Sequence, residues 1–90
     1  MRVIKTSSKF RKELKKIANR TSVISEVNKV IGLLASGQPI PKDYKDHALT
    51  GNWAGFRDLH VAWDVVLIYS YLDDGSVQLE RIGSHSNIFK

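Results

Sequence analysis

The most constraining feature of the sequence is a hairpin pattern close to its C-terminal end. Val65–Tyr71 is rich in β-branched and aromatic residues, and Val77–Ser84 is a second run typical of a strand. The turn Asp73-Asp74-Gly75-Ser76 separates them, and Asp-Gly supplies the positive φ that a tight hairpin turn needs. Gly55–Val61 alternates between two sides, which is the pattern of a third strand. Together these runs predict an antiparallel meander.

Residues 2–37 show a short strand followed by two amphipathic helices. The strand is predicted at residues 2–5, and Thr6, Ser7 and Ser8 follow it as candidate helix N-caps. The apolar stripe of the first helix is Phe10, Leu14, Ile17 and Ala18. The stripe of the second is Val23, Val27, Val30, Ile31 and Leu34. Gly37 is a suitable stop for the second helix.

The predicted element order is β-α-α-β-β-β, an α+β fold in a single domain of residues 1–90. The two helices form a hairpin that packs on one face of a small, mostly antiparallel sheet. The first strand joins this sheet after the helical crossover, and the other sheet face stays partly open. Residues 38–54 are expected to be irregular, and residues 85–90 are expected to add one helical turn.

Positive charge is concentrated at the N-terminal end. The net charge is +5, yet residues 1–20 hold eight Lys or Arg and one acid, while residues 21–90 hold six basic and eight acidic residues. Such asymmetry favours a polyanionic partner: nucleic acid, an acidic protein segment or a membrane surface. A solvated helix face is the simpler alternative.

Several classes are excluded or disfavoured. The chain has no cysteine, which rules out disulfides and thiolate chemistry. Its longest strongly apolar run, Val65–Tyr69, is far shorter than the roughly 20 residues of a membrane span, and no signal peptide is evident. The chain is therefore expected in a bacterial-type cytosol, without a membrane partner. The spacing of the three histidines matches no compact zinc motif, so neither a metal nor a cofactor is predicted.

Histidines, acids and an arginine instead suggest proton-transfer chemistry. RNA carries its own nucleophile, the 2′-OH, so its cleavage needs a base, an acid and a cation beside the phosphorane. Arg81 is a charged residue in an otherwise apolar strand, and such a position needs a structural or functional explanation. Arg81 and His85 lie on the same face of the sheet if that strand continues. Asp58 is predicted to pair locally with Arg57, and Trp53 and Trp63 are predicted to pack in the protein rather than stack on bases.

Residues 44–89 resemble a known family. The run from Tyr44 to His60 (YKDHALTGNWAGFRDLH), together with Asp64, Leu67–Tyr69, Glu80–His85 and Phe89, is similar to the pattern of the YafQ-like toxins of the RelE/ParE superfamily. The resemblance implies a RelE-like fold and a metal-independent endoribonuclease that cuts mRNA, usually on the translating ribosome. It also implies a cognate antitoxin that blocks the toxin.

The resemblance also assigns site residues. The positions that match the active site of the family are His47, His60, Asp64, Arg81, His85 and Phe89. His85 would be the general acid, Arg81 would stabilise the phosphorane, and Phe89 would stack on a base. The general base is open among His47, His60 and Asp64, with Asp64 and His60 acting together preferred. The family pattern has tryptophan directly after the aspartate, where this chain has Val65, so no role passes to Trp63.

The basic first helix is expected to bind two partners. Lys9, Lys12 and Lys16 are expected to bind RNA, and an acidic antitoxin segment is expected on Arg11, Lys12, Lys15 and Lys16. Two other functions stay open: a non-enzymatic ParE-like toxin that targets gyrase, and an RNA-binding module with weak catalysis. Base preference, ribosome dependence, and the identity and stoichiometry of the antitoxin are not predicted.

Overall fold

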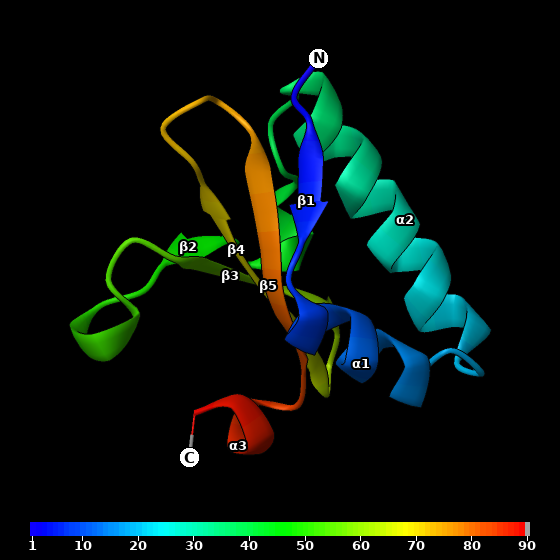
Figure 1. The fold of residues 1–90 in the computed structure, drawn as a ribbon. Coiled ribbons are helices and arrows are strands. Elements are labelled where there is room, and N and C mark those ends of the chain that lie inside the picture. Colours follow the sequence, from blue (N-terminus) through cyan, green and yellow to red (C-terminus); the bar gives the residue numbers. More distant parts are fainter. Residues whose placement is uncertain (90) are drawn as a thin grey trace.

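Residues 1–89, which the computed structural model describes, form a five-stranded sheet in the order β1-β5-β4-β3-β2. The strands are β1 (Ile4–Thr6), β2 (His47–Ala48), β3 (Arg57–Ala62), β4 (Val65–Tyr71) and β5 (Val77–Gly83). The helices are α1 (Ser8–Lys16), α2 (Thr21–Ser36) and α3 (His85–Ile88). Figure 1 shows α1 and α2 on one side of the sheet and α3 beyond the end of β5. The predicted α+β class is confirmed.

The predicted meander is present. β3, β4 and β5 pair antiparallel in sequence order, and Gly75 has the left-handed conformation (φ 86°) that the turn between β4 and β5 requires. β1 joins the far edge of β5 in parallel register, with Ile4 opposite Val77. This first strand begins later than the predicted residues 2–5, although its place in the sheet is as expected.

One strand, β2, was not predicted from the sequence. Residues 38–54, expected to be irregular, contain β2 and two 3₁₀ turns, η1 (Lys42–Tyr44) and η2 (Gly51–Trp53). β2 pairs with β3 and places His47 opposite Asp58. A two-residue strand is too short to show any periodicity, so the pairing with β3 alone defines it.

Capping residues set the limits of the helices. The Ser7 side chain accepts a hydrogen bond from the Phe10 N–H at 2.9 Å, which makes Ser7 the N-cap of α1. α1 ends at Lys16, so the last two residues of its predicted stripe lie beyond the helix. α2 ends at Gly37 (φ 72°), as predicted. The expected C-terminal turn is α3, and Lys90 lies outside the described residues.

The two sheet faces are covered unequally. The main core lies between the sheet and α1 and α2, where Phe10, Val30, Leu59 and Leu67 are almost fully buried. On the other face Val66 and Ile68 of β4 form a smaller cluster with Ile88 of α3, and Trp53 of η2 and side chains that flank η2 and α3 pack against it. This second face is therefore only partly covered, as predicted, and it leaves room for a site.

α1 takes over the outer edge of β5 where β1 ends. The Ser7 hydroxyl donates to the Glu80 carbonyl at 2.7 Å, and the Glu13 carboxylate accepts the Ile82 N–H at 3.2 Å. The same carboxylate forms two hydrogen bonds with the Arg81 guanidinium, each of 2.9 Å. Glu13 on α1 is therefore the ionic partner that explains a charged residue at position 81 of this apolar strand. None of the helices in residues 1–89 has the length and apolar character that crossing a membrane requires.

Glu13→Gln should destabilise the protein by about 1–3 kcal/mol at pH 7, because it removes the charge that binds Arg81. Burial alone would raise the pKa of Glu13, but the hydrogen bonds from Arg81 and Ile82 outweigh it and lower the pKa below its ordinary 4.5. The stabilisation is therefore complete above pH 4.5 and is lost as the pH falls through the folded pKa. Urea unfolding at pH 7 and at decreasing pH measures both effects.

Glu80→Gln is the matched control, since the Glu80 carboxylate accepts a long hydrogen bond of 3.5 Å from Gln78. It should change the unfolding free energy by less than about 0.5 kcal/mol. Equal losses for the two variants, or a wild-type advantage over Glu13→Gln that persists at low pH, would contradict the role given to Glu13.

Candidate active site

The candidate site follows a row of residues that crosses four strands. His47 of β2 lies opposite Asp58 of β3, Asp58 opposite Ile68 of β4, and Ile68 opposite Arg81 of β5. Paired residues in a sheet point to the same face. This is the face away from α1 and α2, because Ile68 belongs to the second apolar cluster. The register therefore brings together side chains that are far apart in the sequence.

The backbone before β2 sets the orientation of His47. Lys45 has a left-handed conformation (φ 53°), unusual for a residue with a side chain, and its carbonyl lies 2.8 Å from His47 Nδ1. A carbonyl only accepts, so Nδ1 carries a proton, and Nε2 of the neutral ring keeps a free lone pair. The intervening Asp46 is anchored by Arg57 at 3.1 Å and by the Tyr69 hydroxyl.

Asp58 is a fully buried carboxylate between two histidines. Its Oδ1 lies 3.1 Å from His47 Nδ1, and its Oδ2 lies 3.5 Å from His85 Nε2. Neither oxygen has a partner with hydrogen-bond geometry among residues 1–89. The prediction that Asp58 pairs with Arg57 is wrong, because neighbouring residues in β3 face opposite ways and Arg57 pairs with Asp46.

His60 and His85 complete the cluster. Their ring centroids are 5.6 Å apart, and one donor atom from each of Asp58, His60 and His85 lies within 4.8 Å of the others. His85 begins α3, because β5 ends at Gly83 before reaching it. Phe89 contacts the His85 ring at a centroid distance of 4.9 Å and Trp53 at 5.6 Å. We name Asp58, His47, His60 and His85 the histidine cluster.

Asp64 lies elsewhere. It forms two hydrogen bonds with Arg20, at 2.9 and 3.0 Å, and it lines a cavity with Glu13 and Ser84. The hydrogen bonds from Arg20 lower the pKa of Asp64, and burial opposes them only in part. A carboxylate with a lowered pKa is a weak proton acceptor. The partner of Asp64 in the structure is Arg20, and Asp64 and His60, which were expected to act together, line different cavities.

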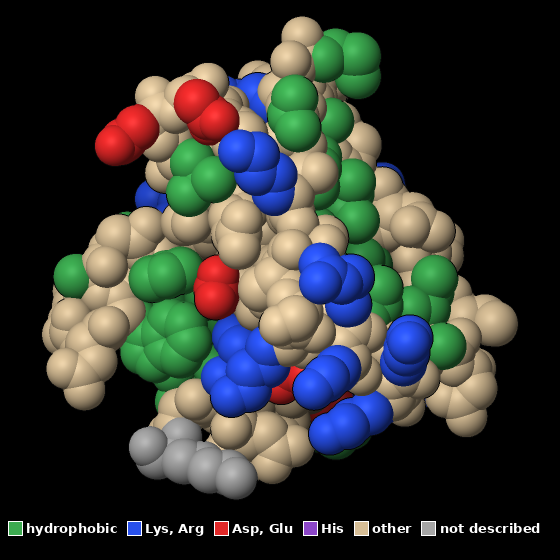
Figure 2. Space-filling view, viewed as in Figure 1, with side chains coloured by type: hydrophobic (Ala, Val, Ile, Leu, Met, Phe, Trp, Pro, Cys, Tyr) green, Lys and Arg blue, Asp and Glu red, His purple; other side chains and the backbone are tan. Residues whose placement is uncertain are grey.

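A basic cavity lies between α1 and α3. It measures about 570 Å³ and is lined by Lys9, Lys12, Glu13, Lys16, Arg81, Asn87 and Ile88. Figure 2 shows Lys and Arg side chains gathered over α1, and the view shows no histidine on this face. The cavity and the histidine cluster meet at α3, since α3 lines the first and carries His85 of the second. Arg11 instead donates to the Thr6 carbonyl at 2.8 Å.

Two features are missed by reasoning from the sequence. Asp58 is interpreted there as a structural residue, although its alternation with His60 places both on one strand face. Trp63 is predicted to pack, and that prediction is wrong, because the side chain lies in the turn between β3 and β4 and is 92% exposed. The same prediction is confirmed for Trp53, which packs against Phe56 at 5.3 Å.

Comparison with known proteins gives a consistent result. A family model described as bacterial toxin of type II toxin–antitoxin system, YafQ, matches residues 2–90. The mRNA interferase toxin YafQ of Escherichia coli strain K12 is 37% identical over 89 residues, which cover 98% of this chain and 96% of that protein.

Solved structures agree over the whole fold. YafQ in the E. coli DinJ-YafQ complex is 36% identical, with a TM-score of 0.86 and full coverage of both chains. A copper-bound mutant toxin from Helicobacter pylori is 35% identical, with a TM-score of 0.90, covering 99% of this chain and 100% of that one.

Asp58→Asn should leave the unfolding free energy at pH 7 unchanged or raise it by up to about 2 kcal/mol, because it replaces a buried acid whose oxygens have no hydrogen-bond partner among residues 1–89 by a neutral amide. Leu59→Ala, the next residue and part of the main core, should lose about 2–5 kcal/mol. Chemical unfolding of both variants measures the contrast. A loss above about 2 kcal/mol in Asp58→Asn would mean that Asp58 is needed for folding.

Proposed function

The chain belongs to the YafQ family of bacterial type II toxin–antitoxin toxins, and on that premise we propose that it is an endoribonuclease that cleaves mRNA with its histidine cluster. The observation that carries the proposal is the placement of His47 and His85 against one buried carboxylate, Asp58. Cleavage through the 2′-OH needs a proton acceptor and a proton donor near one phosphate, and two histidines fill both roles.

We assign His47 as the general base. Its Nδ1 proton is directed at the Lys45 carbonyl, which leaves the Nε2 lone pair to accept the 2′-OH proton. Its side chain is 54% exposed, so RNA can reach it. His85 remains the general acid and protonates the departing 5′-oxygen. The 2′-oxygen then bonds to phosphorus as the bond to the 5′-oxygen breaks, and a cyclic phosphate and a 5′-hydroxyl result.

Asp58 is a positioning residue shared by the two histidines. Its charge favours the protonated ring that His47 becomes after accepting a proton and that His85 is before donating one. As one histidine gains a proton and the other loses one, the charge next to Asp58 stays constant. Burial in a low-dielectric site strengthens both interactions.

The remaining site residues would act on the phosphate and the bases. Glu13 engages Nε and Nη2 of Arg81, so Nη1 is the nitrogen left to contact a phosphorane oxygen. His60 lies beside His85, where it would contact the scissile phosphate. Phe89 supports the His85 ring and retains its proposed base-stacking role. Asp64 would have a structural role, which it fulfils through its two hydrogen bonds with Arg20.

Two partners share the basic helix. Lys9, Lys12 and Lys16 line the cavity beside α3 and would bind RNA phosphates. An antitoxin is proposed because the E. coli relative is described in a DinJ-YafQ complex. Its acidic segment would bind Arg11, Lys12, Lys15 and Lys16 and thereby cover part of the RNA path. Both partners would meet the toxin in the cytoplasm, where mRNA is translated.

A metal fits the cluster but is not required by the proposal. Asp58, His60 and His85 offer one carboxylate and two imidazoles, donors that suit a transition metal, and one H. pylori relative is described as copper-bound. A bound metal would supply Lewis-acid chemistry. The same imidazole nitrogens could not then transfer protons, so we expect cleavage to persist in EDTA and added Zn²⁺ to inhibit it.

His47→Ala and His85→Ala should each lower RNA cleavage by about 10²–10⁴-fold with EDTA present, because each removes one proton-transfer group. Asp58→Asn should also lower cleavage without lowering stability, which separates its role from folding. Purified protein is assayed on free RNA and on programmed ribosomes. Lys42→Ala, an exposed position outside the site, is the matched control.

The outcomes also discriminate the alternatives. Retained cleavage in folded His85→Ala would reject the acid–base mechanism. Failure of folded wild type to cleave either substrate would favour a gyrase-targeting toxin or a binding module. Loss of activity in His60→Ala with full activity in His47→Ala would move the base to His60.

Salt dependence separates the two uses of α1. Replacing Lys9, Lys12 and Lys16 by Gln should weaken RNA binding and flatten the log–log salt dependence by about 0.7 for each phosphate that is no longer bound. Replacing Arg11 and Lys15 by Gln should leave that slope unchanged and weaken antitoxin binding. Fluorescence anisotropy across a salt series measures both. Equal slopes for the two variants would remove the proposed division of the helix.

A further inference from the structure

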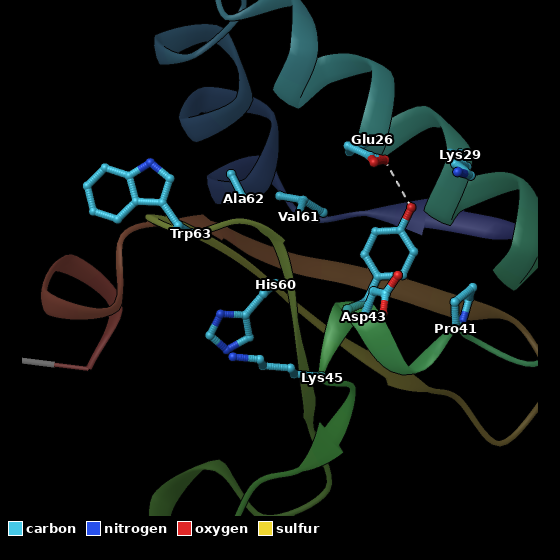
Figure 3. Close-up of a pocket in the computed structure, with 10 residues that line it drawn as sticks. Glu26, Lys29, Pro41, Asp43, Lys45, His60, Val61, Ala62 and Trp63 are labelled. Carbon is cyan, nitrogen blue, oxygen red and sulfur yellow. Dashed lines mark hydrogen bonds between the residues drawn. The ribbon is translucent and has the colours of Figure 1, made fainter.

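A third cavity lies beside the histidine cluster, along the edge of β3 that β2 leaves free. β2 pairs only with Arg57 and Asp58, so His60, Val61 and Ala62 lie beyond its end. The cavity measures about 520 Å³ and extends from Trp63 at one end to Glu26 of α2 at the other. In Figure 3, Trp63 projects outward at one end of the cavity, and Glu26 lies toward the other. The Glu26 carboxylate accepts a hydrogen bond of 3.0 Å from the Tyr44 hydroxyl, and both residues line the cavity.

Trp63 is the unexplained side chain of this cavity. It is 92% exposed and contributes almost nothing to the core. The other large apolar side chains that are exposed within residues 1–89 are Met1, Val3 and Tyr71, which belong to the N-terminal segment and to the far end of β4. Trp63 is therefore a single indole and not part of a broad apolar patch such as a protein partner covers.

The neighbours of Trp63 suit a nucleotide. Lys45 and His60 line the same cavity, and in Figure 3 His60 lies between Trp63 and Lys45. An aromatic platform beside a cation is the arrangement that binds single-stranded nucleic acid, because the ring stacks on a base while the cation attracts the phosphate. His60 belongs to both the cavity and the histidine cluster, so a strand held at the cluster continues directly into the cavity.

We infer that Trp63, with Lys45 and His60, forms a binding subsite for the nucleotide that flanks the cleaved linkage of single-stranded RNA. This inference rests on the proposed function, because the cluster must hold the scissile phosphate. Trp63 stacks on the flanking base, and Lys45 contacts its phosphate. The subsite contributes binding and register along the RNA, and it takes no part in proton transfer.

The test uses Trp63→Ala, with Trp63→Phe as the conservative control. Both variants should unfold like wild type, because the side chain is exposed. Trp63→Ala should weaken binding of an RNA that carries a 2′-deoxy group at the cleaved linkage by about tenfold or more. Trp63→Phe should weaken it by less than about threefold. In cleavage assays Trp63→Ala should raise KM and leave kcat unchanged at saturating RNA.

An abasic nucleotide identifies the position that is held. Placed next to the cleaved linkage, on one side or the other, it should weaken binding to wild type as much as Trp63→Ala does. It should add nothing to the weakening seen in Trp63→Ala, because both changes remove the same stacking interaction. Full additivity at both positions would overturn the inference, as would wild-type RNA affinity in Trp63→Ala.

The readouts distinguish this inference from the proposed function. Binding and cleavage are measured on free RNA and on programmed ribosomes. If wild type cleaves RNA and Trp63→Ala behaves like wild type, only the subsite is rejected. If wild type neither binds nor cleaves RNA, both proposals fail. If Trp63→Ala loses antitoxin affinity and keeps RNA affinity, the indole is a protein contact and the subsite is rejected.

Discussion

The architecture of the site depends on how α1 closes the edge of β5. β1 covers only the first half of that edge, and the Glu13 carboxylate satisfies the Ile82 N–H and the Arg81 guanidinium in the second half. β5 continues from there to Gly83 and into α3, which carries His85. A single acidic residue in a basic helix thus holds the strand whose end delivers the proposed general acid. It also holds the guanidinium proposed to face the phosphate, which fixes the direction of both groups.

Asp58 contributes to the site rather than to the stability of the fold. The second apolar cluster, which lies on the same face, could accommodate an apolar residue at this position of β3, yet the strand buries a carboxyl group whose two oxygens have only poorly aligned histidine partners. Buried acidic groups of this kind rarely stabilise a fold. They do organise neighbouring titratable groups, and here one carboxylate serves histidines from β2 and α3. The strain at Lys45 has a similar meaning, because a left-handed residue directs the His47 ring.

Three surfaces meet at the cluster. The basic cavity adjoins it through α3, the Trp63 cavity adjoins it through His60, and the partly covered apolar face lies beneath it through Phe89 and Trp53. A polyanion bound over α1 and α3 therefore passes close to the proposed acid and base. An acidic antitoxin segment on α1 would compete for the same charge, so inhibition and substrate binding share one electrostatic origin.

Local patterns in the sequence were sufficient for most of the fold. Helix periodicity, the Ser7 cap, the Gly37 stop and the Asp-Gly turn are short-range signals, because each reports contacts within a few residues. The alternation in β3 likewise placed Asp58 and His60 on one face. The family resemblance predicts the three histidines as site residues, and the structure places all three against or beside Asp58.

Only the tertiary structure decided how these side chains are partnered. β2 exists because it pairs with β3, Asp64 is held by Arg20, Arg81 by Glu13, and Asp58 lies between His47 and His85. Each of these partners is distant in sequence, and no local propensity encodes such a pairing. The exposure of Trp63 is decided in the same way, because an indole in a turn packs only if another element reaches it.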